Sequence, residues 1–356
     1  MSSKADIGEQ AQAGRDFYRA LVIRRQLILV ALATALAFSL CVDLALGPAR
    51  YGLGQVVEAL LWPSQVDEQL RVILWEIRMP VALMALVVGA SLSVAGMQMQ
   101  TILNNPLASP FTLGISAGAG FGAALALAFG VVIFPFAVDY VVPVNAFLMA
   151  MLTSMAIYGL SLRRGVTSET IVLLGIALVF IFNALMSLIQ FFASQQAVAA
   201  VVFWTMGSLT KATWPKLWIS LSVLVIALPL LARRGWALTA MRLGDAKAES
   251  MGVRLRSLRL EVLLIVSLLA SISVSFVGTI GFIGLVGPHI ARMLLGEDQR
   301  FLLPGTALSG ALILSIGSIC SKMIIPGTVI PIGIVTAIVG IPFFLYLILN
   351  RRVATW

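Results

Sequence analysis

Charged residues are scarce in this chain. Asp, Glu, Lys and Arg together make up 11% of the 356 residues, whereas hydrophobic residues make up 60%. Soluble domains carry about 25% charged residues, so the composition excludes an ordinary soluble domain. The apolar stretches are continuous and do not alternate with polar residues, as the strands of a membrane barrel would. The sequence therefore predicts an all-α protein that crosses the membrane several times.

Cysteine and histidine are almost absent. Cys41 and Cys320 lie in separate apolar segments without the spacing of metal ligands, so neither a disulfide framework nor a zinc site is expected. The single histidine, His289, cannot build a haem or metal site within one chain, although two copies in a dimer would face each other in principle. The favoured interpretation of His289 is a structural hydrogen bond, and we expect no cofactor and no metal site.

Motifs for catalysis are also missing. The chain contains no G-x-x-x-x-G-K-[ST] phosphate loop, so it is not expected to hydrolyse nucleotides itself. No Ser, His and Asp pattern indicates a hydrolase nucleophile. No carboxylate lies clearly in the middle of a predicted span, where proton- or sodium-coupled carriers bury such groups. These absences argue against an enzyme and against a secondary transporter.

Long apolar segments make up most of the chain. Because about 20 residues cross a membrane as a helix, we expect ten spans. They lie near 27–46, 79–103, 113–134, 141–162, 169–193, 215–232, 260–279, 285–296, 302–323 and 332–350. A tail of residues 1–26 precedes this single domain of residues 27–352. The first span is expected to be retained, because no small-x-small cleavage site follows it cleanly.

The basic residues predict the orientation. With ten spans and a cytoplasmic N-terminus, 18 of the 24 Lys and Arg residues fall on the cytoplasmic side, as the positive-inside rule requires. Both termini are then expected in the cytoplasm, and the multi-pass chain is expected to contact membrane lipid. The basic residues cluster at segment ends and not along one soluble face, so they indicate topology and no nucleic-acid partner.

One polar segment interrupts the apolar pattern. Residues 233–261 contain ten charged residues, of which seven are Lys or Arg. Such a segment must lie in water, and its basic excess places it in the cytoplasm. The loop 233–259 is therefore the largest internal surface that this chain offers a soluble partner.

Glycine is concentrated in two regions. Gly278, Gly281, Gly284 and Gly287 are spaced three apart before Pro288. Because glycine at this density disfavours a regular helix, we expect irregular backbone or a tight re-entry over the short eighth span. A second cluster is predicted to allow close contact between helices; it consists of Gly114, Gly118, Gly120 and Gly122.

Four long stretches resemble the permease subunits of ABC importers for iron chelates, haem and cobalamin, the FecCD-type family. They are IRMPVALMALVVGASLSVAGMQMQTILNNPLASPFTLGISAGAGFG (77–122), GDAKAESMGV (244–253), GFIGLVGPHIARMLLGEDQRFLLPG (281–305) and PIGIVTAIVGIPFFLYLILNRR (331–352). The resemblance implies ten spans and a homodimer with the translocation path on its twofold axis. It implies as partners a second copy of the chain, two ATP-binding cassette subunits and a substrate-binding protein, soluble or anchored.

The resemblance assigns the segment 244–252 to ATPase coupling, as a short helix that seats in a groove of the ATPase subunit. The residues implied are Gly244, Asp245, Ala246, Ala248, Glu249 and Gly252. Small residues let a partner's backbone approach closely, and Asp245 and Glu249 provide charges near a helix start.

The outer face and the inner gate are assigned in the same way. Arg78 and Lys322 match positions that dock the binding protein. Val81 departs from the pattern, since many members carry a second Arg there, and Lys322 offers a point charge in place of a guanidinium fork. The turn 104–107 resembles the cytoplasmic gate, and an ordinary connection between spans is the alternative. The constricting residues are Asn105 and Leu107, opposed by Thr167 and Ser168.

Three polar residues recur at helical spacing on the fifth span. Asn183, Ser187 and Gln190 share one face. They either line a path for a large, weakly held cargo or form hydrogen bonds between helices.

The function that the resemblance implies is transport without enzymatic activity of its own. The chain is expected to be the permease of an ATP-driven importer for an iron chelate, a ferric siderophore, with haem and cobalamin as alternative cargoes. Two other classes stay open from the residues alone: an ATP-independent carrier or channel, and a membrane receptor or scaffold without transport.

Overall fold

The computed structural model describes residues 3–47, 51–133, 138–161, 168–325 and 327–349. These residues form helices and connecting segments, and no strand occurs among them, so the all-α prediction is confirmed. The elements are α1 (Ser3–Ala45), α2 (Leu53–Leu61), α3 (Glu68–Val72), a π-helix (Ile73–Arg78), α4 (Met79–Ile102), α5 (Ile115–Phe129), α6 (Val138–Ser161), α7 (Ser168–Phe192), α8 (Gln195–Thr205), α9 (Trp214–Arg233), α10 (Gly235–Met241), α11 (Asp245–Ser250), α12 (Leu255–Val277), α13 (Ile283–Leu295), α14 (Gln299–Met323) and α15 (Ile332–Leu349).

Seven helical segments in the described chain are long and apolar enough to cross a membrane. They correspond to α1, α4, α6, α7, α9, α12 and α14, in the case of α1 from Gly14 onwards. Three shorter apolar helices, α5, α13 and α15, occupy the remaining positions where spans are expected. Every predicted span thus corresponds to one helix, because long apolar runs are the strongest local signal in a membrane protein.

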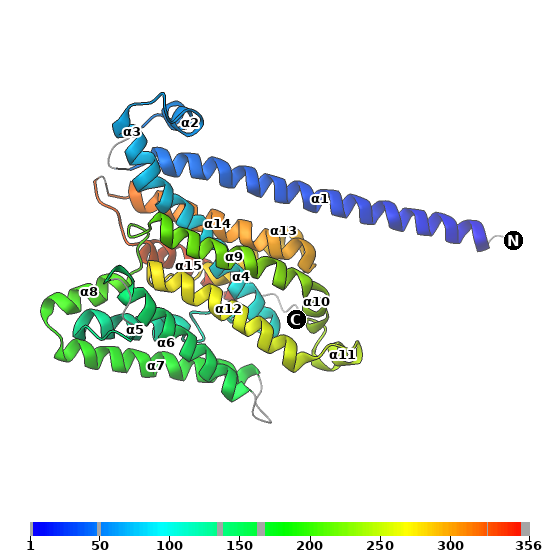
Figure 1. The fold of residues 1–356 in the computed structure, drawn as a ribbon. Coiled ribbons are helices and arrows are strands. Elements are labelled where there is room, and N and C mark those ends of the chain that lie inside the picture. Colours follow the sequence, from blue (N-terminus) through cyan, green and yellow to red (C-terminus); the bar gives the residue numbers. More distant parts are fainter. Residues whose placement is uncertain (1–2, 48–50, 134–137, 162–167, 326, 350–356) are drawn as a thin grey trace.

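The helices form one elongated bundle with two different ends (Figure 1). The short helices α2 and α3 lie at one end, called here the α2 end. The helices α10 and α11 lie at the other, called here the α11 end. Helix α1 flanks the bundle and continues beyond it at the α11 end. The segment 1–26, expected as a tail, therefore belongs from Ser3 onwards to the same continuous helix as the first span.

Helix α4 forms the centre of the bundle. Nearly all of its residues are buried, and it packs against α9, α12, α13 and α14. Glycines allow the closest approaches: a Cβ atom at Gly89 would collide with the backbone of Gly310, and one at Gly96 with the backbone of Gly284. Small residues at such crossings maximise packing where no hydrophobic effect operates between helices in lipid.

The glycine-rich eighth span differs from the prediction. Residues 283–295 form the regular helix α13, and irregular backbone is confined to the segment 278–282 before it. The expectation of irregular backbone or a tight re-entry in the glycine-rich run 278–287 is met over 278–282 and is wrong from Ile283 onwards. There Gly284 and Gly287 face α4, where a side chain would meet Leu92 or Ser93. Tertiary packing here overrides the low helix propensity of glycine.

Candidate transport and coupling sites

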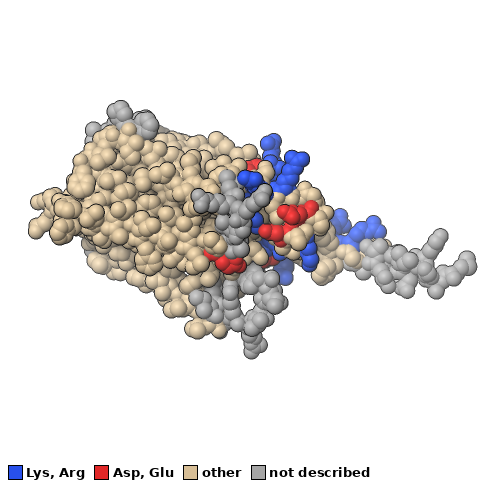
Figure 2. All heavy atoms as spheres, turned by 90° about the horizontal axis from the view of Figure 1, so that it is seen from below, with Lys and Arg blue, Asp and Glu red and all other residues tan. Residues whose placement is uncertain are grey.

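Charged side chains gather at the α11 end. Figure 2 shows this on the face seen from below, where the rest of the visible apolar bundle carries almost no charge. Ion pairs connect several of these residues: Arg234 with Glu261, Arg242 with Glu297, Arg259 with Asp245, and Arg25 and Arg300 with Asp298. Hydrogen bonding to Glu261 raises the pKa of the Arg234 guanidinium. Hydrogen bonds from Arg300 hold the pKa of the Asp298 carboxyl below its usual range.

The predicted coupling segment forms a short helix between two glycines with left-handed backbone. Gly244 has φ +93° and Gly252 has φ +85°, conformations that an L side chain rarely adopts. Both glycines are therefore required by the turn geometry at the two ends of α11. Ala248 is fully buried against the rest of the chain, and the other predicted residues of α11 are exposed, namely Asp245, Ala246 and Glu249.

Two apolar residues that the sequence reasoning missed flank this helix. Leu243 is 56% exposed and Met251 is 45% exposed, one on each side of α11. An exposed large apolar side chain thus stands at each end of α11, and the alternation of small apolar and charged residues around Ala248 was the sequence signal for a contact surface here. Methionine suits adaptable contacts with a partner.

Asp245, the first residue of α11, forms an ion pair with Arg259 of α12. The Arg259 Nη2 atom lies 2.8 Å and 2.9 Å from the two carboxylate oxygens of Asp245. The Nε atom of the same guanidinium donates to the Ile102 carbonyl at 3.1 Å. Ile102 ends α4, so one arginine side chain contacts α11 and the end of the central helix together.

The predicted gate turn follows directly after Ile102. Asn104 has a left-handed φ of +45°, the Asn105 amide donates to the Gln100 carbonyl at 3.1 Å, and the Leu107 amide donates to the Asn105 side chain at 2.9 Å. These local bonds fix the turn to the last turn of α4. Leu107 is 41% exposed, so its side chain projects from the single chain.

A cluster of polar side chains surrounds the inner side of this turn. Arg242 pairs with Glu297, and Arg292 donates to Gln100. Gln100, Arg242 and Arg292 line a small cavity together with Asn104 and Asn105. One side of the turn therefore lies against charged groups from α13 and from the residue that follows α10, while Leu107 stays exposed on the other.

The opposing gate and the polar face of α7 are only partly described. Thr167 lies outside the described residues, and Ser168 is described only as the first residue of α7. Asn183 and Ser187 are exposed and Gln190 is half-buried. The Ser187 hydroxyl donates to the Asn183 carbonyl within the same helix at 2.9 Å.

Arg78 lies at the α2 end and is buried. Its Nη1 atom donates to the carbonyls of Leu44 and Ala45 at 2.7 Å and 3.1 Å, and only 7% of the residue is exposed. The guanidinium also lies over the Tyr51 ring, 5.0 Å from its centroid. Much of its hydrogen-bonding capacity is thus used to hold the end of α1, a role that the sequence reasoning did not foresee.

Lys322 is likewise engaged with α1. Its Nζ atom lies 2.8 Å from an Asp43 carboxylate oxygen, and the Ser318 hydroxyl donates to the same carboxylate at 3.1 Å. Asp43 is fully buried. Arg78, Val81 and Lys322 line one cavity of about 220 Å³, so the structure brings the predicted docking residues and the divergent position together.

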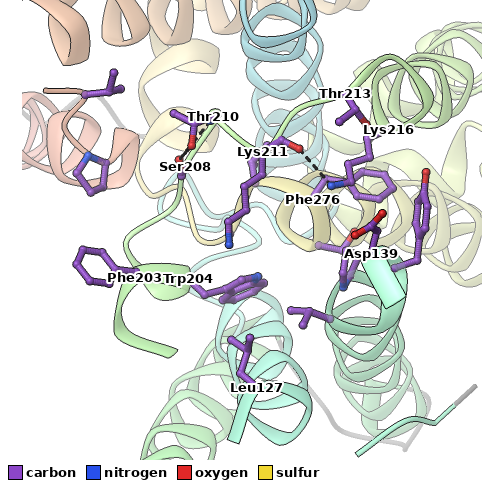
Figure 3. A pocket seen from close by; sticks show the side chains of 18 of the residues that line it. Leu127, Asp139, Phe203, Trp204, Ser208, Thr210, Lys211, Thr213, Lys216 and Phe276 are labelled. Atoms are coloured by element: carbon purple, nitrogen blue, oxygen red, sulfur yellow. Dashed lines mark hydrogen bonds between the residues drawn. The ribbon is translucent and has the colours of Figure 1, made fainter. Parts of the chain in front are cut away.

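A larger cavity of about 1020 Å³ opens beside them at the α2 end (Figure 3). Lys211, Trp204 and Asp139 are arranged around it, and the Lys216 ammonium donates to the Lys211 carbonyl at 3.2 Å. The sequence reasoning counted the two lysines among the outer charges but did not foresee this cavity, because its walls come from segments far apart in the sequence.

Backbone bonds between distant segments support one wall of this cavity. The Ser208 amide donates to the Val277 carbonyl at 2.7 Å, and the Ile332 amide donates to the Gly207 carbonyl at 3.1 Å. Gly207 has φ +71° and approaches Thr279 too closely for a side chain. The wall is therefore a fixed junction of α12, α15 and the segment that follows α8.

His289 packs against Phe343 of α15, with ring centroids 5.7 Å apart and an edge-on arrangement. Among the described residues no group of three or more His, Cys, Asp or Glu side chains is placed to hold a metal ion. The sites consist of close helix contacts, mostly apolar cavities with a few charged side chains at their walls, and ion pairs that hold helix ends.

The described residues form a helical bundle with seven membrane-length apolar helices, charge gathered at one end and the two larger cavities at the other. This is the architecture of a multi-span membrane transport protein. The chain belongs to the FecCD transport family, whose model matches residues 35–350. It is 34% identical over 326 residues to the vitamin B12 import system permease of Serratia proteamaculans, covering 91% of this chain and 92% of that protein. It is 35% identical over 313 residues to the hemin transport system permease of Yersinia pestis, covering 88% and 94%.

A solved structure supports the same relationship. An inward-facing transporter described as of the metal-chelate ABC type superposes with a TM-score of 0.79 and 30% sequence identity, covering 91% of this chain and 99% of that one. The chain is therefore a permease component of the ABC type, and its named relatives are transport subunits.

Proposed function

We propose that this chain is the permease subunit of an ATP-driven importer that moves an iron chelate, a ferric siderophore, across the inner membrane into the cytoplasm. Haem and cobalamin are the alternative cargoes, since relatives of similar identity are named for hemin and for vitamin B12. The family membership supports the class of cargo, a metal chelate of considerable size.

The observation that carries the proposal is the exposed helix α11 and its connection to the turn 104–107. In a chain without a phosphate loop, ATP hydrolysis belongs to a partner. Helix α11 presents Ala246 and Glu249 to that partner between the exposed side chains of Leu243 and Met251. The basic excess around it supports a cytoplasmic α11 end, and we propose that both termini are cytoplasmic as well.

The exposed polar face of α7 supports a homodimer. Along the membrane-length stretch of α7 only 11% of the residues are buried within one chain. Asn183 and Ser187 are exposed on this helix, and polar side chains within a span face protein or water in preference to lipid. A second copy across a twofold axis would place these residues on a water-filled path, with the three short helices as part of ten spans in each subunit.

The α2 end then faces outwards and receives the loaded binding protein. Arg78 and Lys322 lie on one cavity, and Lys211 and Lys216 lie on the larger one. We propose that the acidic groups of the binding protein dock over this basic region. Since the side chains of Arg78 and Lys322 are both largely buried, Lys211 and Lys216 carry more of the accessible charge than the family pattern implies.

Reconstitution tests this function. Proteoliposomes containing this permease and its ATPase receive ATP on the α11 side and a binding protein loaded with ferric siderophore, haem or cobalamin on the other. We expect ATP turnover to rise and cargo to accumulate with the ferric siderophore. Equal uptake without ATP would identify the ATP-independent carrier instead, and binding without accumulation would identify a receptor.

A further inference from the structure

In the described part of the chain, the Arg259 side chain of α12 joins the coupling helix to the end of α4. Its Nη2 atom binds the Asp245 carboxylate on α11 at 2.8 Å and 2.9 Å, and its Nε atom donates to the Ile102 carbonyl at 3.1 Å. The final carbonyls of a helix lack partners within the helix, so Ile102 offers an acceptor that an outside donor can satisfy.

The guanidinium is suited to hold both contacts at a fixed separation. It is planar and presents its donors in a rigid fork, whereas a lysine ammonium is a single point on a flexible stem. A displacement of Asp245 therefore shifts the same rigid group that holds Ile102. Both carboxylate oxygens of Asp245 bind Arg259, so the whole acidic group takes part in the connection.

The turn 104–107 follows the movement of Ile102 because it is bound to α4 by its own backbone. The amide of Asn105 donates to Gln100 on the last turn of the helix, and Leu107 is held by the side chain of Asn105. The path from α11 to Leu107 is thus continuous: an ion pair, one hydrogen bond to a helix end, and a locally closed turn.

The ion pair itself contributes little to folding. The side chains of Arg259 and Asp245 are 35% and 53% exposed, and ion pairs at such sites contribute little measurable stability. The Arg259–Asp245 ion pair thus links α12 and α11 but stabilises the fold little. This fits a role in positioning the two helices better than a role in stability.

We propose that Arg259 is the positioning residue that transmits the movement of α11 to the turn 104–107. The inference rests on the proposed function, in which α11 contacts the ATPase and Leu107 closes the path. Arg259 thereby determines how much cargo is moved for each ATP hydrolysed, without touching cargo or nucleotide.

Three variants in the reconstituted importer test this role. Arg259→Gln removes the charge; the exchange Asp245→Arg with Arg259→Asp restores an ion pair but leaves no donor for Ile102. The matched control is Arg234→Gln, which removes another exposed ion pair to α12, that of Arg234 with Glu261 at 2.7 Å; among the described residues Arg234 makes no hydrogen bond to α4. The readouts are co-purification of the ATPase, ATP turnover, uptake per ATP, and nucleotide-dependent crosslinking of a cysteine at Leu107.

For Arg259→Gln we expect an assembled complex that still hydrolyses ATP, with uptake per ATP reduced between about 2- and 30-fold, the range of coupling changes carried by single residues. The crosslink at position 107 should no longer respond to nucleotide. The exchange variant should stay uncoupled, and Arg234→Gln should behave as wild type.

Two results would overturn the inference while leaving the proposed function intact: unchanged uptake per ATP in Arg259→Gln, or full recovery in the exchange variant, which would show that the ion pair alone matters. Absence of ATP-driven uptake in the wild type would instead refute the proposed function and the inference with it.

Discussion

At the scale of single residues, the buried carboxylate of Asp43 determines what Lys322 does. Asp43 is fully buried and accepts from Lys322 and Ser318. Removing one partner of a buried ion pair leaves an uncompensated charge and costs about 3–5 kcal/mol. Lys322 is therefore an anchor for the end of α1 as well as a candidate for docking.

We predict that Lys322→Met lowers the thermal unfolding midpoint of the purified permease, because the Asp43 charge loses its counter-ion. The double variant Asp43→Asn with Lys322→Met should recover most of the loss, since no charge is then left buried. A thermal scan in detergent compares the three proteins. If the single variant melted at the wild-type temperature, Lys322 would not stabilise Asp43 and its charge would be free for docking alone.

Contacts of this kind could not be predicted from the sequence. The family resemblance identified Arg78 and Lys322 and placed them outside, but it did not show that both bind the end of α1. The acceptors of Arg78, the carbonyls of Leu44 and Ala45, lie more than 30 positions away in the chain. Hydrogen bonds to backbone atoms leave no pattern of residue types that a sequence displays.

At the scale of elements, α4 depends on glycine at its crossings. Gly96 packs on the backbone of Gly284 in α13, so an added methyl group has no space unless the helices separate. Overpacking of this kind costs about 1–3 kcal/mol. Gly159, in α6, is the matched control, because a methyl group added there would meet no neighbouring element of the described chain within 4 Å.

We predict that Gly96→Ala destabilises the permease by about 1–3 kcal/mol. Gly159→Ala should leave stability unchanged or raise it by up to about 1 kcal/mol, through the better helix propensity of alanine. Chemical unfolding in mixed micelles measures both. Equal stability of the two variants would mean that α4 and α13 separate without cost and that their close contact is not required.

The helices themselves were predictable where they are long and apolar. Helix α14 was expected at 302–323 and extends over Gln299–Met323. The short elements α2, α3, α8 and α10 were not foreseen, because they are too short to give a hydropathy signal. For the eighth span the glycine pattern favoured irregular backbone, whereas close packing on α4 stabilises a helix there. That outcome depends on a partner helix, which local propensity does not include.

At the scale of the whole molecule, the proposed function assigns different roles to the two ends of the bundle. The α11 end carries the charged surface and the connection through Arg259 to the turn after α4. The α2 end carries the cavities lined by Lys322, Lys211 and Lys216. Counting Lys and Arg residues along the sequence correctly predicted that charged residues are concentrated at one end of the bundle. It could not predict the cavities, whose walls combine segments far apart in the sequence.

The exposure of Leu107 in a single chain is the feature that a dimer explains most directly. The side chain is 41% exposed and projects from a turn that is otherwise held by its own hydrogen bonds. If the twofold axis passes beside the polar face of α7, two copies of Leu107 approach each other and close the path on the cytoplasmic side. ATP binding, transmitted by α11, would change their separation.

Crosslinking of Leu107→Cys tests this account most directly. The variant is made in a protein without Cys41 and Cys320, reconstituted with the ATPase, and treated with a short bifunctional thiol reagent with and without nucleotide. Leu27→Cys is the control, an exposed residue on α1, which flanks the bundle on the side opposite α7 in Figure 1. We expect dimers crosslinked through position 107 in a nucleotide-dependent manner, with uptake blocked, and none through position 27. Crosslinking that ignores nucleotide, or none at all in an intact dimer, would contradict the assignment of the turn 104–107 as the gate.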